Sequence, residues 1–426
     1  KQRTRSQVCA FGQSSRLGGK PPPMYTGSRP SPIQTCTLKP LKAGNPEALA
    51  SEQPLSSQTS LPEVLSPCSR EWTPLGTPAS WSSTPCRREW SLTPCLRKPE
   101  GQFATVQKTQ EIQDWQPERF MLKQKLQSAP KNHGRVDWMF DIARGEHVAV
   151  KVMPNNWVCR SHEDFLVHHA DAVEQPWMDF ACAAFLQATA FPYCCPLLGI
   201  YRDSEATRAV TALATHGDFF AWASSCKCGP GPEREQLVLP LAVQLLDAVR
   251  WLHNLGIVHR DISLENVLLK QLDDGSFQLQ LIDFSMASTS RWSSGLECCL
   301  RGKNIYRAPE AYRGGACDGF HLDSFAVGVA LYAAVVGDHP WFSTEPGRCK
   351  IFSYAREEGF RALADKRKIS NYRARVSERL SGPLIQLLAG LLAFDPEERT
   401  TLGELAWSGC WRQSVWEEAW LCDKGF

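Results

Sequence analysis

The segment IVHRDISLENVLLK, residues 257–270, contains the side chains best suited to chemistry. Asp261 closes a His-Arg-Asp triplet, and Asn266 follows after four residues. This spacing suits an aspartate that receives a proton and an asparagine that holds a metal ion. Ser263, two residues after Asp261, stands where a lysine would be expected to meet a phosphate. The segment is therefore either a working catalytic loop or the remains of one.

Other short motifs flank this loop in a fixed order. Lys151 ends the strand-like sequence VAVK, Asp283 opens Asp-Phe-Ser, and Ala-Pro-Glu follows at 308–310. Each motif alone is weak, but together and in this order they resemble the eukaryotic protein kinases from about Phe120 to Trp411. The evidence lies in the order of the motifs rather than in any one of them.

The resemblance implies ATP and Mg²⁺ as cofactors and a phosphoryl transfer that depends on positioning and electrostatics. It implies that Lys151 neutralises the α- and β-phosphates and that Asp283 and Asn266 bind magnesium. Asp261 would orient the acceptor hydroxyl and take its proton. The alternative is an ordinary strand lysine and a loop-capping aspartate.

The loop that would cover the phosphates departs from the family pattern. The matching stretch APKNHGRV keeps only Gly134 and Val136, while Ala129 and Lys131 replace the first two glycines. Glycine lets backbone N–H groups approach phosphate closely. We therefore expect looser cover, with Lys131 adding charge.

Two further positions also differ from the family. The family's strand lysine pairs with a helix glutamate, and the best match here is Asp179, with Glu174 as a second candidate and a helix-surface role for Asp179 as the alternative. Aspartate is one methylene shorter, so either the helix sits nearer or the pair is longer. Ser285 replaces the glycine after Phe284; serine restricts positive φ, so we expect fewer flips of Phe284 and no loss of metal.

Ser263 and Lys303 look exchanged relative to the serine/threonine kinases. The family has a lysine where this chain has Ser263, and a threonine where this chain has Lys303. We predict that Lys303 reaches back to Asp261 and the γ-phosphate and restores the missing positive charge. The alternative is a Lys303 side chain that points to solvent.

The resemblance also assigns nucleotide-contacting and structural residues. Cofactor-binding candidates besides Gly134, Val136, Lys151, Asp179 and Asp283 are Ala149, Thr211, Leu213 and Leu268. Glu310 is expected to form a buried ion pair with Arg399, and Asp323 to steady the catalytic loop. The motifs that contain Glu310, Arg399 and Asp323 favour a protein substrate over a small molecule.

The elements that must position these residues change type along the chain. Strand patterns come first and helical patterns later, which indicates an α+β fold. The resemblance makes it a two-lobed protein kinase-like fold, with a small β-rich N-lobe and a larger α-helical C-lobe. The predicted elements are a strand over 147–153, helices over 176–188 and 237–256, a hairpin over 271–284 and a buried helix around 325–336. The predicted divisions are a disordered Pro/Ser/Thr-rich tail at 1–114, a kinase domain at 115–415 (N-lobe 115–216, C-lobe 217–415) and a C-terminal extension at 416–426.

Composition narrows the functional class. The chain has 426 residues and a formal charge of +2, which argues against a dedicated nucleic-acid or membrane-surface protein. Its 17 cysteines show no C-x-x-C zinc pattern, and no signal peptide is apparent, so we expect reduced thiols in the cytoplasm or nucleus. The expected partners are protein substrates. An active serine/threonine kinase is the first hypothesis, a pseudokinase scaffold the second, and a small-molecule phosphotransferase the third.

Overall fold

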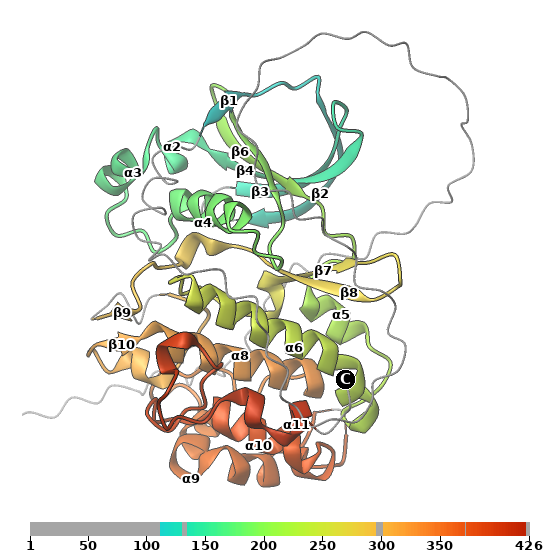
Figure 1. Ribbon diagram of the computed structural model, residues 1–426, viewed down its shortest axis with the longest axis vertical. Coiled ribbons are helices and arrows are strands. Elements are labelled where there is room, and N and C mark those ends of the chain that lie inside the picture. Colours follow the sequence, from blue (N-terminus) through green and yellow to red (C-terminus); the bar gives the residue numbers. More distant parts are fainter. Residues whose placement is uncertain (1–110, 130–133, 295–300, 371, 423–426) are drawn as a thin grey trace, which may run out of the picture. The chain divides into compact units, whose positions relative to one another are not determined.

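A computed structural model describes residues 111–129, 134–294, 301–370 and 372–422 (Figure 1). Strands dominate up to residue 212 and helices after it, so the predicted α+β, two-lobed fold is confirmed. The tail predicted to be disordered lies outside the described residues up to position 110. The glycine-loop position Lys131 also lies outside them.

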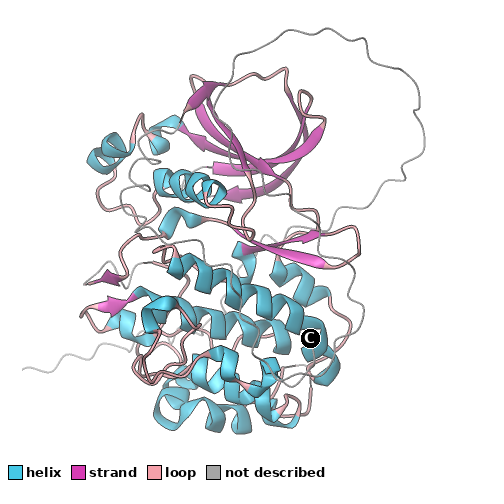
Figure 2. Cartoon of the chain, viewed as in Figure 1, coloured by secondary structure: helices cyan, strands magenta, loops and turns pink. Residues whose placement is uncertain are grey.

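The N-lobe is built on one six-stranded sheet, strongly curved in Figure 2. Its strand order is β1-β5-β6-β4-β3-β2, with β1 parallel to β5 and the other neighbours antiparallel. The strands are β1 (Ile112–Asp114), β2 (Phe120–Ala129), β3 (Gly134–Asp141), β4 (Glu146–Pro154), β5 (Leu197–Arg202) and β6 (Ala206–Ala212).

Alternation along β4 decides which side chains face the site. Val148, Val150 and Val152 are buried in the core of the lobe. Ala149 and Lys151 point to the opposite face because successive residues of a strand alternate. Strand β4 therefore directs the side chain of Lys151 away from the core of the N-lobe.

The predicted start of the domain falls too late. β1 pairs with Ile200–Arg202 of β5, so residues 112–114 belong to the sheet and not to the tail. Trp115 then stacks on Phe120 with ring centroids 4.5 Å apart. The N-lobe therefore begins before residue 115.

Helix α4 follows an unusual connector. The connector after β4 contains two short helices, α2 (Asn155–Val158) and α3 (His162–His168), before α4 (Pro176–Ala188) begins with proline at its first turn, as predicted. Trp177 of α4 donates from Nε1 to the carbonyl of Val158 at 2.7 Å, which ties the helix to the connector.

The C-lobe packs helices around α8, and every residue of that helix is buried. By length and composition α8 could cross a membrane, but its complete burial identifies it as the core helix that the sequence predicted. The helices of this lobe are α5 (Phe219–Ser225), α6 (Pro232–Asn254), α8 (Gly319–Val336), α9 (Lys350–Lys366), α10 (Gly382–Leu391) and α11 (Ala419–Cys422).

Short strands and 3₁₀ turns complete the lobe. The predicted hairpin forms between β7 (Val267–Gln271) and β8 (Phe277–Leu281), with Gly275 at positive φ in its turn. The small pair is β9 (Trp292–Ser293) and β10 (Cys317–Asp318). The 3₁₀ turns are η1 (Leu264–Asn266), η2 (Phe284–Met286), η3 (Pro309–Tyr312), η4 (Val376–Glu378), η5 (Leu405–Trp407) and η6 (Val415–Glu417).

The predicted C-terminal extension is not separate from the lobe. The boundary between 415 and 416 cuts through η6. Trp420 of α11 is buried and donates from Nε1 to Oε2 of Glu235 at 3.0 Å. Residues up to Cys422 therefore belong to the C-lobe.

Candidate active site

The loop that carries Asp261 is held by α8. Asp323 accepts hydrogen bonds from the backbone N–H groups of His259 at 2.7 Å and Arg260 at 2.9 Å. Arg260 has a φ of 68°, a conformation that non-glycine residues seldom adopt. The two bonds to Asp323 hold the loop in this shape, as the sequence predicted.

A buried histidine that the sequence did not point to supports the same aspartate. His253, near the end of α6, donates to Asp323 at 3.1 Å and to Glu404 at 2.7 Å. Burial alone would lower the pKa of His253, but the two carboxylates outweigh burial and raise it to about 9. A protonated imidazole therefore joins two buried carboxylates behind the catalytic loop.

Asp261 has one carboxylate oxygen fixed and one free. Asn266 Nδ2 donates to the carbonyl and to Oδ2 of Asp261, both at 2.8 Å. Oδ1 of Asp261 is buried and has no hydrogen-bond partner within the described part of the chain. Burial raises the pKa of Asp261 to about 7, with Lys303 opposing this rise and the charge of Asp283 adding to it. This is the arrangement expected of a group that receives a proton near neutral pH.

Lys151 lies between two carboxylates. Its Nζ is 2.7 Å from Oδ2 of Asp179 and 3.2 Å from Oδ1 of Asp283. Desolvation opposes the charged amine, but these neighbours raise the pKa of Lys151 above its ordinary value. The helix partner is Asp179 rather than Glu174.

The shorter side chain of Asp179 is accommodated by a close helix. Oδ1 of Asp179 accepts the N–H of Phe284 at 2.9 Å, and the N–H of Gln175 donates to the carbonyl of Ser285 at 2.8 Å. Helix α4 therefore sits directly on the Asp-Phe-Ser turn. One carboxylate contacts both Lys151 and the turn, and the Lys151–Asp179 pair is not lengthened by the shorter side chain.

Lys303 faces the loop, but its partners differ from the predicted one. Nζ donates to Ser263 Oγ at 2.6 Å and is 3.1 Å from Glu265 Oε2. The predicted direct contact with Asp261 is absent among the described residues, and the influence of Lys303 on Asp261 is through charge. The hydroxyl of Ser263 and the carboxylate of Glu265 bind the amine in place of Asp261.

Gly302 allows the approach of Lys303. Its φ is 78°, and a Cβ at this position would lie 2.7 Å from the carbonyl oxygen of Arg260. Glycine is thus required both by conformation and by space. It brings the backbone that carries Lys303 against the catalytic loop.

The predicted nucleotide contacts lie on β3, β4, β6 and β7 and directly after β6. Val136 is paired with Lys151 across β3 and β4, and Ala149 is opposite Thr211 across β4 and β6. Leu268 of β7 forms a bridge with Asp218, the residue that caps α5. All residues of the predicted set are half-buried: Gly134, Val136, Ala149, Thr211, Leu213 and Leu268.

The donor set around Asp283 fits a hard cation. Ile282 donates from its N–H to the carbonyl of Asn266 at 3.1 Å. This bond brings Asn266, just before β7, next to Asp283, just after β8. Asp283 is in the left-handed conformation, with φ 63° and ψ 68°, and Lys151 outweighs desolvation to lower its pKa. An ionised carboxylate and a carboxamide oxygen are ligands that suit Mg²⁺.

The predicted structural ion pair is present. Arg399 Nη2 donates to Glu310 Oε2 at 3.0 Å, and both residues are buried. Arg399 also donates to the carbonyl of His321 at 2.8 Å. The pair ties the Ala-Pro-Glu segment to the loop that follows α10.

Comparison with known proteins places these features in one family. Residues 132–409 match the model of the protein kinase domain. The chain is 32% identical over 214 residues to testis-specific serine/threonine-protein kinase 5 of Mus musculus, covering 50% of this chain and 51% of the relative. It is 28% identical over 210 residues to serine/threonine-protein kinase SIK1 of Rattus norvegicus, covering 49% and 23%. The matches thus span about half or less of the length of these relatives.

Proposed function

The chain belongs to the protein kinase family, and on that premise we propose that it transfers the γ-phosphate of Mg-ATP to serine or threonine hydroxyls of protein substrates. The names of the relatives support the serine/threonine class. The observation that carries the proposal is the geometry of Asp261. Its Oδ2 is fixed by Asn266, while its buried Oδ1 has no hydrogen-bond partner among the residues that the structure describes. This oxygen is therefore available to the hydroxyl of an incoming substrate.

Each site residue has a role in this proposal. Lys151 offsets phosphate charge, and Asp283 with Asn266 would hold magnesium, which would supply further positive charge to the phosphates. Asp261 aims the acceptor hydroxyl and removes its proton. Lys303 supplies the positive charge that Ser263 lacks, and the bond from Lys303 to Ser263 at 2.6 Å supports this exchange of roles.

The direct test is phosphate transfer by the full chain with labelled ATP and magnesium. We expect label on protein substrate or on the chain itself for the wild type and its absence in Asp261→Asn. Asp273→Asn is the matched control, since Asp273 is an exposed aspartate of the β7–β8 turn. Equal transfer by wild type and Asp261→Asn would refute the proposal.

A pseudokinase is the second candidate, favoured by the engagement of Lys303. Its amine is paired with Glu265 at 3.1 Å, so part of its charge is already compensated. A scaffold of this kind would show a thermal shift with Mg-ATP and no transfer. Transfer restricted to small hydroxyl compounds would instead support a small-molecule phosphotransferase.

A further inference from the structure

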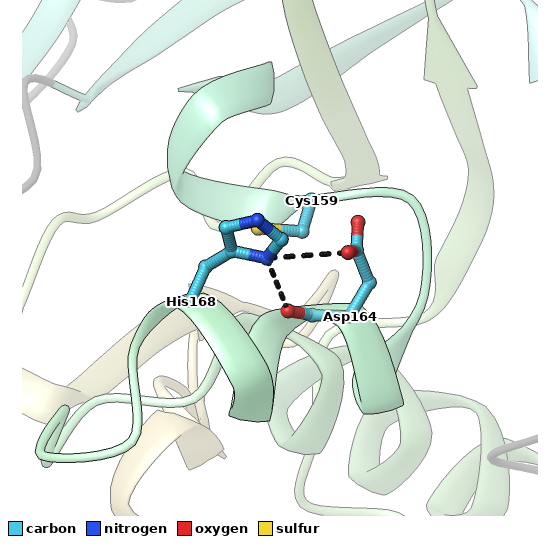
Figure 3. A group of neighbouring side chains, drawn as sticks. All are labelled: Cys159, Asp164 and His168. Carbon is cyan, nitrogen blue, oxygen red and sulfur yellow. Dashed lines mark hydrogen bonds and ion pairs between the residues drawn. The ribbon is translucent and has the colours of Figure 1, made fainter.

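Three side chains that carry a thiol, a carboxylate and an imidazole converge in the connector between β4 and α4. Cys159 follows α2, while Asp164 and His168 lie one turn apart on α3 (Figure 3). One donor atom from each residue lies within 4.8 Å of the other two. Asp164 Oδ1 and His168 Nδ1 are 3.2 Å apart. The cluster is separate from the catalytic residues described above.

The backbone of Cys159 supplies an independent observation. Its φ of 61° and ψ of −173° lie in a region that is essentially reserved for glycine. The conformation is held by a hydrogen bond from its N–H to Asn155 at 2.8 Å and by Arg202, which donates to its carbonyl at 2.7 Å. A thiol is thus kept at a position where glycine would fit without strain. Such strain is characteristic of functional sites.

The three donor groups indicate which metal ion would bind. Thiolate, imidazole and carboxylate together are zinc ligands, whereas Mg²⁺ and Ca²⁺ prefer oxygen donors alone. Tetrahedral zinc places its donor atoms about 3.5 Å apart, so the cluster needs to close by only about 1 Å. A thiolate and a carboxylate would also balance the charge of a divalent cation.

We propose that Cys159, Asp164 and His168 bind Zn²⁺ with the fourth position open to water. Binding would release the thiol proton and form the sulfur–metal bond. His168 would exchange its present bond to the carbonyl of Asp164, 2.9 Å long, for the metal. A simple Asp164–His168 helix pair would account for those two residues, but it leaves the strained cysteine unexplained.

The position of the cluster gives the metal a structural effect. Val158, directly before Cys159, accepts the buried hydrogen bond from Trp177 on the first turn of α4. Zinc would therefore fasten α2 to α3 at the point where α4 is anchored. An effect of zinc on catalysis would act through Asp179 of α4 and therefore rests on the proposed function. Metal binding itself does not depend on the proposed function.

The test uses the full chain stripped of metal and titrated with Zn²⁺ alone, with Co²⁺ as a spectroscopic probe. We expect a Co²⁺–thiolate charge-transfer band and a rise in unfolding temperature with zinc. Cys159→Gly removes the thiol and relieves the backbone strain, so it should fold and lose both signals. His168→Gln should weaken zinc binding at least about 10-fold, since even outer-shell changes have effects of that size.

Matched controls separate this site from the other thiols. Cys410→Ser and His147→Gln change exposed residues outside the connector and should bind zinc as the wild type does. Unchanged zinc affinity in Cys159→Gly, or no thiolate band in the wild type, would overturn the proposal. Both readouts are independent of phosphate transfer, so they stand even if the chain proves inactive.

Discussion

Replacement of Lys303 by methionine is expected to change the pH dependence of catalysis as well as its rate. The ionised form of Asp261 is the one that takes a proton, so activity should rise as pH increases through the pKa of about 7. Lys303 lowers this pKa by its charge. Loss of an opposite charge at close range raises a carboxyl pKa by about 1 unit or more.

The size of the effect follows from the ionised fraction. At pH 7 about half of the Asp261 carboxyls are ionised in the wild type, and a rise of about 1 unit leaves about a tenth. This alone reduces kcat/KM for Mg-ATP about fivefold at pH 7. Loss of the phosphate contact adds a pH-independent factor on the order of 100.

The assay is a pH profile of kcat/KM for Mg-ATP between pH 5.5 and pH 10, values chosen about 1.5 units below and about 3 above the pKa. We expect the acid limb of Lys303→Met to move upward by about 1 unit and that of Lys303→Arg to stay in place. Lys270→Met, at an exposed lysine of β7, is the matched control. An acid limb that does not move in Lys303→Met would refute the electrostatic coupling to Asp261.

The remaining predictions concern the supports of the site. Arg399→Met should destabilise the fold by about 3–5 kcal/mol, because it leaves Glu310 charged and buried without its partner; urea unfolding measures this. The raised pKa of His253 contributes stability that is complete below about pH 6.5 and is lost as pH rises to about 9. The free energy of unfolding of the wild type should therefore fall by about 3 kcal/mol over that window, and His253→Gln should abolish this fall. Asp179→Ala should reduce kcat/KM on the order of 100-fold by releasing Lys151, whereas a reduction below about threefold would show that the pair is dispensable.

The candidate site residues were predictable because each motif is local and lies on an element with a clear pattern. Alternating valines in β4 fix the face that Lys151 occupies, whatever the rest of the chain does. Asp261 and Asn266 are close in sequence, so their contact follows from the loop itself. The partner of Lys303 was harder to predict, because a four-carbon side chain can reach several acceptors. Only the folded loop determines which of them the amine contacts.

Features that depend on distant or short segments escaped prediction. His253 looks like one polar residue in an apolar helix until Glu404, 151 residues later, is brought beside it. Strand β1 has three residues, too few for a periodic signal, so the domain boundary was placed after it. The zinc ligand candidates span C-x₄-D-x₃-H, and their convergence depends on the strained backbone at Cys159.

The double contact of Asp179 links two motions that could otherwise be independent. An outward swing of α4 would pull its carboxylate from the N–H of Phe284 as well as from the amine, because both bonds end on one side chain. A rearrangement of the Asp-Phe-Ser turn would likewise break its hydrogen bond to Asp179 and release α4. Inhibitors that stabilise one displaced element should thus trap the other with it, and conformations in which only one has moved should be scarce.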